Sequence, residues 1–301
     1  MVSPEPLRSL VTVAPPRPGS VLVTGVPRSG TTWLARELAR SRGAGLAGRE
    51  PMNPRRGQFA LGGTVTGWTE LAPPSARQAR LLRRCYAGRE PRVLSRYGEH
   101  QLRAALPGGT TVVKDPFALL SLPAVVAATG TAAVVVYRPA AAVLASYRRM
   151  GWRADTTELR ALPGAPSGPA PQDDAEAMVE FWNELHERVL QVLPGLPGVL
   201  VVSHAELLAG GAPAVEVLLS RLGLPSLRPV AARQPARTAA SALLRRRVRA
   251  GRPRLHDFQR SGSEVAEGWR SRVDDAERLQ LERATASVWQ RLEDVRTPVE
   301  P

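Results

Sequence analysis

Short apolar runs alternate with segments of helical periodicity along most of the chain. The run at 20–25 is rich in β-branched residues and ends in glycine, which is typical of a buried strand in a parallel sheet. Positions 31–41 carry leucines four residues apart, which predicts a helix that Thr31 and Thr32 are able to cap. Strand, glycine-containing loop and helix therefore follow one another at the start of the predicted domain.

The same alternation continues beyond this first unit. We predict further strands at 110–114, 132–137 and 198–203, followed by helical segments at 117–128, 140–150 and 204–222. Strands that alternate with helices predict an α/β fold with a doubly wound parallel sheet. In such sheets ligands bind at the carboxyl ends of the strands.

Two helices and one loop complete the pattern. The Pro- and Gly-rich segment 161–172 predicts a surface loop, which we expect to be mobile and close to the site. The segments 174–193 and 273–294 have helical periodicity, and we expect the second to pack on the sheet as the final helix. The organisation we expect is an N-terminal extension at 1–19, a single domain at 20–295 and a tail at 296–301.

Composition fits a globular protein of basic character. The chain has 301 residues, 43% of them hydrophobic and 23% charged, and 41 Lys plus Arg outnumber 27 Asp plus Glu, giving a net charge of +14. This balance suits an anionic partner, but an Arg-rich composition set by genome base content explains it equally well. Lys114 is the only lysine. Charge alone therefore does not identify the function.

Cysteine and histidine usage limits the kinds of site that the chain can build. Cys85 is the only cysteine, which excludes an intramolecular disulfide and a cysteine-built metal site. The four histidines do not cluster with carboxylates in a way that suggests zinc, and we expect His204 to cap and pack at a helix start. No signal-peptide pattern or long apolar run is visible, so we expect a cytoplasmic protein without a stable membrane anchor.

The segment 25–32, with the sequence GVPRSGTT, has the context of an anion-binding loop. It lies between a predicted buried strand and a helix, where backbone N–H groups bind phosphate-like anions. Gly25 and Gly30 have the spacing of a Walker A loop, but Thr31 stands where an NTPase needs lysine. An ordinary ATP or GTP hydrolase is disfavoured, and a P-loop kinase or NTPase with a degenerate loop stays open as an alternative.

The segment 27–34, with the sequence PRSGTTWL, closely resembles the 5′-phosphosulfate loop of sulfotransferases, which use 3′-phosphoadenosine 5′-phosphosulfate (PAPS) as donor. The resemblance implies a P-loop-like three-layer sandwich with a central parallel sheet flanked by helices. It also implies that the phosphosulfate is bound by Arg28, Ser29, Gly30, Thr31 and Thr32. Trp33 resembles the tryptophan that stacks on adenine in cytosolic members, with a core aromatic as the alternative.

Two later segments resemble the family's 3′-phosphate motifs. Arg138 follows the predicted strand 132–137, and Ser146 lies eight residues further on. An arginine at a strand's carboxyl end supplies a bidentate cation. The segment 258–262 and Trp269 are similar to the Phe-x-Arg-Lys-Gly … Trp pattern, with serine in place of the lysine. The resemblance implies that the 3′-phosphate is held by Arg138, Ser146, Arg260, Ser261 and Gly262.

The catalytic base is harder to assign than the donor-binding residues. Cytosolic members carry a histidine shortly after the lysine that corresponds to Lys114, and this chain has none there. Glu50, in REPMNP, resembles the Glu-Pro-x-Asn-Pro segment of bacterial members, which implies that it deprotonates the acceptor. Asp115 is the alternative base. Its alternative role is structural, as a cap for the helix beginning near Pro116. Arg28 and Lys114 would stabilise charge on the leaving phosphate.

The expected reaction is transfer of a sulfuryl group from PAPS to an acceptor hydroxyl, or less favourably an amine, by in-line displacement without a metal. The product of the donor is 3′-phosphoadenosine 5′-phosphate. The acceptor class stays open among carbohydrates, glycolipids and small molecules. The arginine run at 245–254 makes a basic nucleic-acid-binding protein the second alternative, but without a recognised module or interleaved aromatics we expect no nucleic-acid partner.

Overall fold

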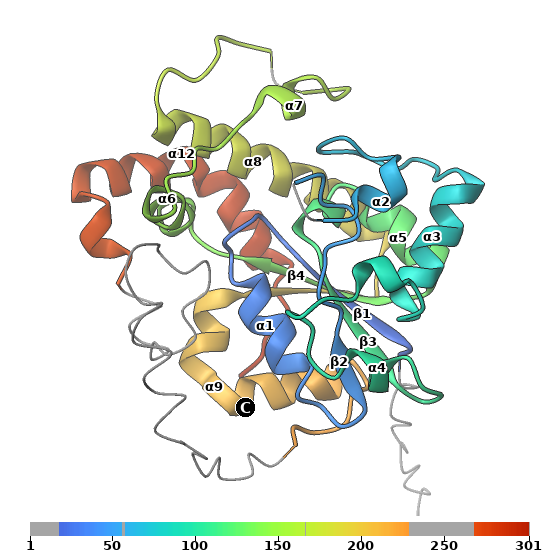
Figure 1. The fold of residues 1–301 in the computed structure, drawn as a ribbon. Coiled ribbons are helices and arrows are strands. Elements are labelled where there is room, and N and C mark those ends of the chain that lie inside the picture. The colour runs from blue at the N-terminus through green and yellow to red at the C-terminus, as the bar shows by residue number, and fades with distance from the viewer. Residues whose placement is uncertain (1–17, 56–57, 166, 229–267, 301) are drawn as a thin grey trace, which may run out of the picture.

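The computed structural model describes residues 18–55, 58–165, 167–228 and 268–300. Within these ranges the chain forms one five-stranded sheet of order β2-β3-β1-β4-β5, and every pairing is parallel (Figure 1). The strands are β1 Ser20–Thr24, β2 Ala44–Leu46, β3 Thr110–Lys114, β4 Ala132–Tyr137 and β5 Val199–Ser203. The chain leaves β1 toward β2 and leaves β4 toward β5, so the strand order reverses between β1 and β4. Ligands of open α/β sheets bind at such a switch point.

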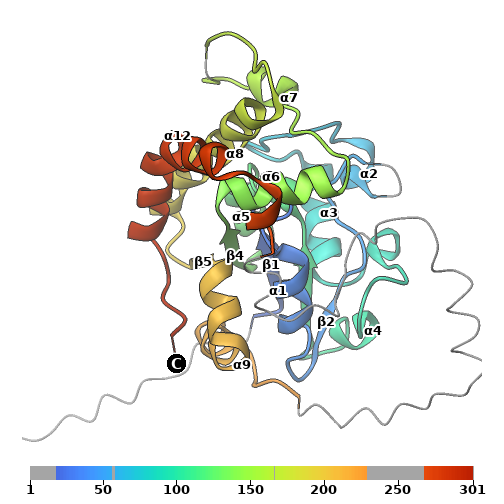
Figure 2. The same cartoon turned by 90° about the vertical axis from the view of Figure 1, so that its left-hand side faces the viewer.

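Helices cover both faces of the sheet, which confirms the three-layer α/β architecture (Figures 1 and 2). One face is covered by α1 (Thr31–Leu38) and α9 (His204–Arg221). The other face carries α3 (Ala76–Tyr86), α5 (Leu122–Thr129) and α6 (Ala140–Arg149), with α8 (Asp174–Val192) and α12 (Asp275–Asp294) packed on α6. Short helices α2 (Ala60–Gly63), α4 (Gln101–Ala104) and α7 (Thr157–Arg160) lie in the connections.

The strands are apolar because both of their faces are buried. In β1, Val21 and Val23 pack in the cluster with α1 and α9, whereas Leu22 packs in the cluster on the opposite face. The same alternation in β4 sends Val134 to the first cluster and Val135 to the second. Side chains of a strand alternate between faces, and a sheet covered on both sides needs apolar residues at every position.

Two local predictions about helix starts have different outcomes. The expected capping by Thr31 and Thr32 is wrong, because Gly30 occupies the N-cap of α1 in a left-handed conformation and no side chain caps it. The capping role of Asp115 is confirmed, since its Oδ1 accepts a 3.1 Å hydrogen bond from the Phe117 backbone N–H. The turn that it caps is the 3₁₀ helix Pro116–Ala118, and α5 begins only at Leu122.

The last helix packs mainly on other helices and meets the sheet at the end of β4. It lies against α8 and α6 (Figure 2), its Trp289 ring contacts Tyr137 of β4, and Tyr137 OH donates a 2.8 Å hydrogen bond to Glu293 Oε1. Leu279, expected on its apolar face, is exposed, and Leu281 is buried in its place. Beyond this helix Thr297 N–H donates a 2.7 Å hydrogen bond to Val201 O, and Val299 is fully buried. The chain therefore stays packed along β5 past residue 295.

The predicted loop at 161–172 has no regular secondary structure at its described positions. Arg160 contacts it from α7 through hydrogen bonds from its guanidinium to Gly168 O at 2.9 Å and Pro169 O at 2.8 Å. Among the described helices, none is both long enough and apolar enough to span a bilayer.

Candidate functional site

The loop between β1 and α1 is pressed against neighbouring elements at two glycines. A Cβ at Gly25 would lie 2.2 Å from Val136 O of β4, and a Cβ at Gly30 would lie 2.0 Å from His204 Cδ2. Gly30 also has a φ of 99°, a conformation that side chains disfavour. These two close approaches require glycine and fix the loop at the switch point of the sheet.

A buried hydroxyl lies inside this loop. Ser29 is fully buried, and among the described residues its Oγ has no hydrogen-bond partner. Its backbone N–H donates a 3.0 Å hydrogen bond to Val26 O, which closes the turn before α1. Thr31 is buried and Thr32 and Trp33 are half-buried in the first turn of α1. Because buried polar atoms normally have a partner, the loop has the chemistry to accept an anionic ligand.

Arginines from three elements converge beside the loop. Arg28 Nε donates a 2.9 Å hydrogen bond to Ser146 Oγ of α6, which joins two of the predicted site residues. Burial lowers the pKa of Arg28, and repulsion from Arg149 adds to the effect. The pKa of Arg138 is also lowered, to about 10. Burial is the main cause, and repulsion from Arg28 and Arg149 contributes less. A buried group of like charges is stabilised by a ligand of opposite charge.

The backbone of Arg138 is fixed from α8. Trp182 Nε1 donates a 2.9 Å hydrogen bond to Arg138 O at the end of β4. The carboxyl ends of β1 and β4 therefore both lead into arginines, and Ser146 of α6 contacts the first of them. The structure thus brings together the parts of the two phosphate motifs that the sequence places 110 positions apart, from Arg28 to Arg138.

Glu50 and Lys114 form an ion pair beside this cluster. Glu50 is buried and also accepts a hydrogen bond from Asn53 Nδ2, while its backbone N–H donates to Gln58 Oε1 at 3.0 Å. The pKa of Lys114 is lowered to about 8, mainly because the side chain is buried. Attraction to Asp115 opposes this lowering, and repulsion from Arg28 adds to it. The Glu50 carboxylate favours the charged ammonium. Two of the three predicted catalytic residues are thus in direct contact.

Asp115 lies under the same segment and is fully buried. Its Oδ2 accepts a 2.5 Å hydrogen bond from Met52 N–H, and its Oδ1 accepts the bond from Phe117 N–H. Burial raises the pKa of this carboxyl, although both hydrogen bonds and Lys114 oppose the rise. Asp115 therefore ties the Glu50 segment to the end of β3.

The structure adds His204 to the candidate site, where the sequence had not placed it. It is the first residue of α9, buried against Gly30, and its ring meets Trp33 edge-on at 6.2 Å between centroids. Burial lowers its pKa to about 3, with repulsion from Arg138 adding to it, so the ring is neutral near pH 7. The packing expected of His204 is confirmed, but its side chain makes no cap. Only its place at a strand's carboxyl end was visible in the sequence.

Part of the predicted site lies outside the described residues. These positions are Arg260, Ser261, Gly262 and the arginine run at 245–254. Trp269, the last residue of that motif, is half-buried and packs against the core on the α6 and α8 side of the sheet.

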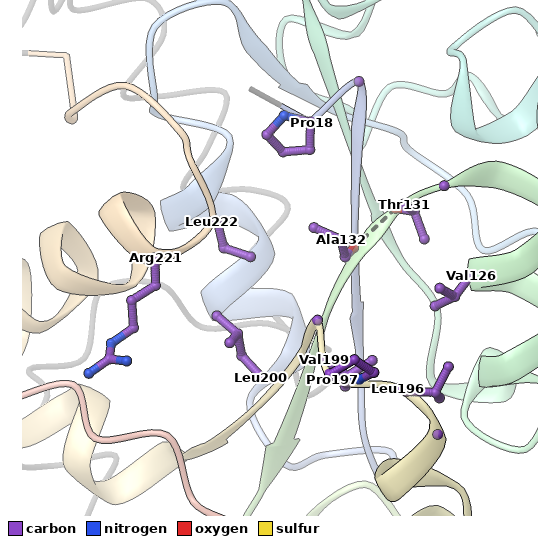
Figure 3. Close-up of a pocket in the computed structure, with 14 residues that line it drawn as sticks. Pro18, Val126, Thr131, Ala132, Leu196, Pro197, Val199, Leu200, Arg221 and Leu222 are labelled. Carbon is purple, nitrogen blue, oxygen red and sulfur yellow. Dashed lines mark hydrogen bonds between the residues drawn. The ribbon is translucent and has the colours of Figure 1, made fainter. Parts of the chain in front are cut away.

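A cavity of about 570 Å³ lies at the opposite edge of the sheet (Figure 3). It is bordered by the amino ends of β4 and β5 and by the start of the described chain at Pro18. Its lining is mainly apolar or glycine, and includes Val126, Ala132, Leu196, Leu200 and Leu222. None of the predicted site residues that the structure describes lines it.

Comparison with known proteins identifies the class of this molecule. A model of the protein family described as the sulfotransferase family matches residues 18–229, so the chain belongs to the sulfotransferase family. The match includes the described candidate residues from Arg28 to His204. Among solved structures, sulfotransferase STF1 from Mycobacterium tuberculosis H37Rv is similar at 19% identity and a TM-score of 0.38, over 85% of this chain and 76% of that one. A search of curated proteins finds no match.

The protein is therefore a transferase of a family that binds PAPS and transfers sulfuryl groups. Family membership establishes the type of enzyme but not the acceptor.

Proposed function

We propose that this chain transfers the sulfuryl group of PAPS to a hydroxyl group of a carbohydrate, glycolipid or small-molecule acceptor. The observation that carries the proposal is the convergence of Arg28, Arg138 and Ser146 beside the buried Ser29 hydroxyl. A compact cluster of this kind suits a ligand with several negative charges. PAPS supplies an activated sulfuryl group on a phosphate that leaves as 3′-phosphoadenosine 5′-phosphate.

The donor would be held at two ends. Backbone N–H groups of 28–32 would bind the phosphosulfate at the start of α1, where the helix dipole favours negative charge. Arg138 and Ser146 would bind the 3′-phosphate, together with Arg260, Ser261 and Gly262 from the sequence motif. Trp33 would stack on adenine, and the neutral His204 ring would help to hold it through their edge-on contact.

Glu50 is the proposed base. Its carboxylate would take the acceptor hydroxyl proton while the new S–O bond forms and the S–O bond to the phosphate breaks in line. The Lys114 ammonium forms an ion pair with this carboxylate. Asp115 is less suited to the role, because it is fully buried, whereas the Glu50 side chain keeps 10% of its surface exposed.

Positive charge supplied by the protein would stabilise the leaving phosphate. Arg28 lies in the donor loop and Lys114 lies close enough that its pKa responds to Arg28. Fixed charges at the place where negative charge develops supply much of the rate enhancement in many enzymes, and here they would replace a metal ion. An amine is the less favoured acceptor, because a protonated amine would be repelled by this cationic cluster.

The direct test is a transfer assay with sulfur-labelled PAPS and a panel of hydroxylated acceptors, in the presence of EDTA. We expect labelled product and stoichiometric 3′-phosphoadenosine 5′-phosphate. The kinase alternative predicts instead a requirement for ATP and Mg²⁺, and the nucleic-acid alternative predicts salt-sensitive binding to nucleic acid with no product. Either of these results in place of transfer would overturn the proposal.

A further inference from the structure

One arginine close to the donor loop has no role in the proposed mechanism. Arg55 is exposed, and its guanidinium carbon lies 5.4 Å from the Trp152 ring centroid and 6.0 Å from that of Phe117. The same Trp152 ring lies 5.7 Å from the guanidinium carbon of Arg28. One indole therefore contacts the donor-loop arginine and Arg55 together.

Hydrogen bonds connect Arg55 to the proposed base. The Arg55 backbone N–H donates a 2.8 Å bond to Asn53 Oδ1, and the other end of the Asn53 amide donates to Glu50 Oε2. The Asn53 side-chain amide thus hydrogen-bonds both to the Glu50 carboxylate and to the Arg55 backbone N–H. The Arg55 backbone is thus linked to the proposed base, and its guanidinium lies beside the Trp152 ring that also contacts Arg28.

The charged and titratable groups facing Arg55 do not neutralise it. Hydrogen bonds from Thr157 are the main reason that the pKa of Asp155 is lowered, and attraction to Arg55 contributes less. Burial raises the pKa of Tyr147 to about 12, with Arg55 and Arg28 opposing the rise, so this phenol stays neutral. Within the described part of the chain no carboxylate is close enough to Arg55 for an ion pair.

Aromatic contacts of this kind favour one type of ligand. A guanidinium beside aromatic rings is attracted through the ring faces, which leaves its in-plane N–H groups to donate. Those groups match a planar anion in a bidentate arrangement. We propose, on the basis of the function above, that the acceptor carries a carboxylate or similar anionic group near its hydroxyl and that Arg55 binds this group.

The test compares acids with their neutral esters as acceptors. The probes are 4-hydroxyphenylacetate and glucuronate, each beside its methyl ester, assayed with wild type and with Arg55→Gln and Arg55→Lys. Losing a charge-assisted hydrogen bond predicts that Arg55→Gln raises KM for the preferred acid by about 10- to 100-fold. We expect KM for the ester to change less than about twofold, and Arg55→Lys to be intermediate because it keeps the charge and loses the bidentate geometry.

The control variant is Arg83→Gln, which removes the same charge from an exposed position on α3. We expect its KM values to match those of the wild type. The inference is wrong if neither acid is preferred to its ester, or if Arg55→Gln raises KM for acid and ester equally. Weakened binding of 3′-phosphoadenosine 5′-phosphate by Arg55→Gln would assign this arginine to the donor and also overturn it. Failure of the wild type to bind that nucleotide would instead overturn the proposed function.

Discussion

The two ends of the same parallel strands differ sharply in chemistry. At the carboxyl ends of β1, β3 and β4 the chain places Arg28, Lys114 and Arg138, all partly or largely removed from water. At the amino ends of β4 and β5 lies the cavity of about 570 Å³, where Arg221 is the one charged residue among the described lining residues (Figure 3). The cavity at the amino ends therefore offers little chemistry, and the candidate site residues lie at the carboxyl ends.

The difference follows from the topology of the sheet. Each strand leads at its carboxyl end into a loop and then into the N-terminus of a helix, so backbone N–H groups and helix dipoles point toward that edge. At the amino ends the chain arrives from helix C-termini, and glycines and prolines fill the turns. Volume alone does not mark a site, whereas convergent charged groups at the strand switch do.

The largest effect is expected at the base. Glu50→Gln keeps the hydrogen bond to Asn53 but cannot accept a proton, so kcat should fall by about 10² to 10⁴ while nucleotide binding stays within a few-fold. Steady-state kinetics and calorimetry measure the two quantities. The exposed Glu282→Gln on α12 is the matched control and should keep the wild-type kcat. If Asp115→Asn abolishes turnover and Glu50→Gln does not, the base is Asp115.

The next pair of variants compares the two ends of the sheet. Arg138→Ala at the carboxyl end of β4 should weaken binding of 3′-phosphoadenosine 5′-phosphate by about 100-fold or more, because it leaves a buried phosphate without its partner. Arg221→Ala beside the amino-end cavity removes the same charge and should change that affinity by less than about twofold. Equal losses in the two variants would mean that overall charge, and not the cluster, binds the nucleotide.

A pair of glycine variants probes the same contrast through shape. Gly30→Ala brings a Cβ against the buried His204 ring in a left-handed conformation, so the free energy of unfolding should fall by about 1–3 kcal/mol. Gly198→Ala, on the lining of the amino-end cavity, meets no atom within 4 Å and should change it by less than about 0.5 kcal/mol. Denaturant unfolding measures both, and a harmless Gly30→Ala would contradict the close packing of the loop.

The smallest effect concerns pH. Since burial lowers the pKa of Lys114 to about 8, the ammonium loses its proton as the pH rises through that value, and kcat should decline with it. Below this pH the lysine is charged and the rate reaches its plateau. Lys114→Arg should carry its charge through this range and shift the alkaline decline upward. An unchanged pH profile in that variant would remove Lys114 from the reaction.

Sequence patterns predicted the framework of the fold and missed its weakest elements. Apolar runs and periodicity located β1, β3, β4 and β5, because strands buried on both faces have to be apolar throughout. The three residues of β2 are too few to give a pattern, and arginines and a glutamine interrupt the apolar positions of α3. A capping box between Ser75 and Gln78 was the available signal for α3.

The site was predictable only where a residue belongs to a local motif. The donor loop, Arg138 and Glu50 stand in recognisable segments at strand ends. The Asp115 bond to Met52, the contact of His204 with Gly30, and Arg55 between two aromatic rings join positions far apart in the chain. Such contacts depend on the tertiary arrangement, for which spacing in one sequence contains no signal.

The most direct test of the central claim is calorimetric titration of the full chain with 3′-phosphoadenosine 5′-phosphate in EDTA, beside ATP with Mg²⁺. We predict binding of the first nucleotide without metal, lost in Arg138→Ala and retained in Arg221→Ala. Binding of ATP with Mg²⁺ alone, or of neither nucleotide, would contradict the assignment of the arginine cluster as a PAPS site.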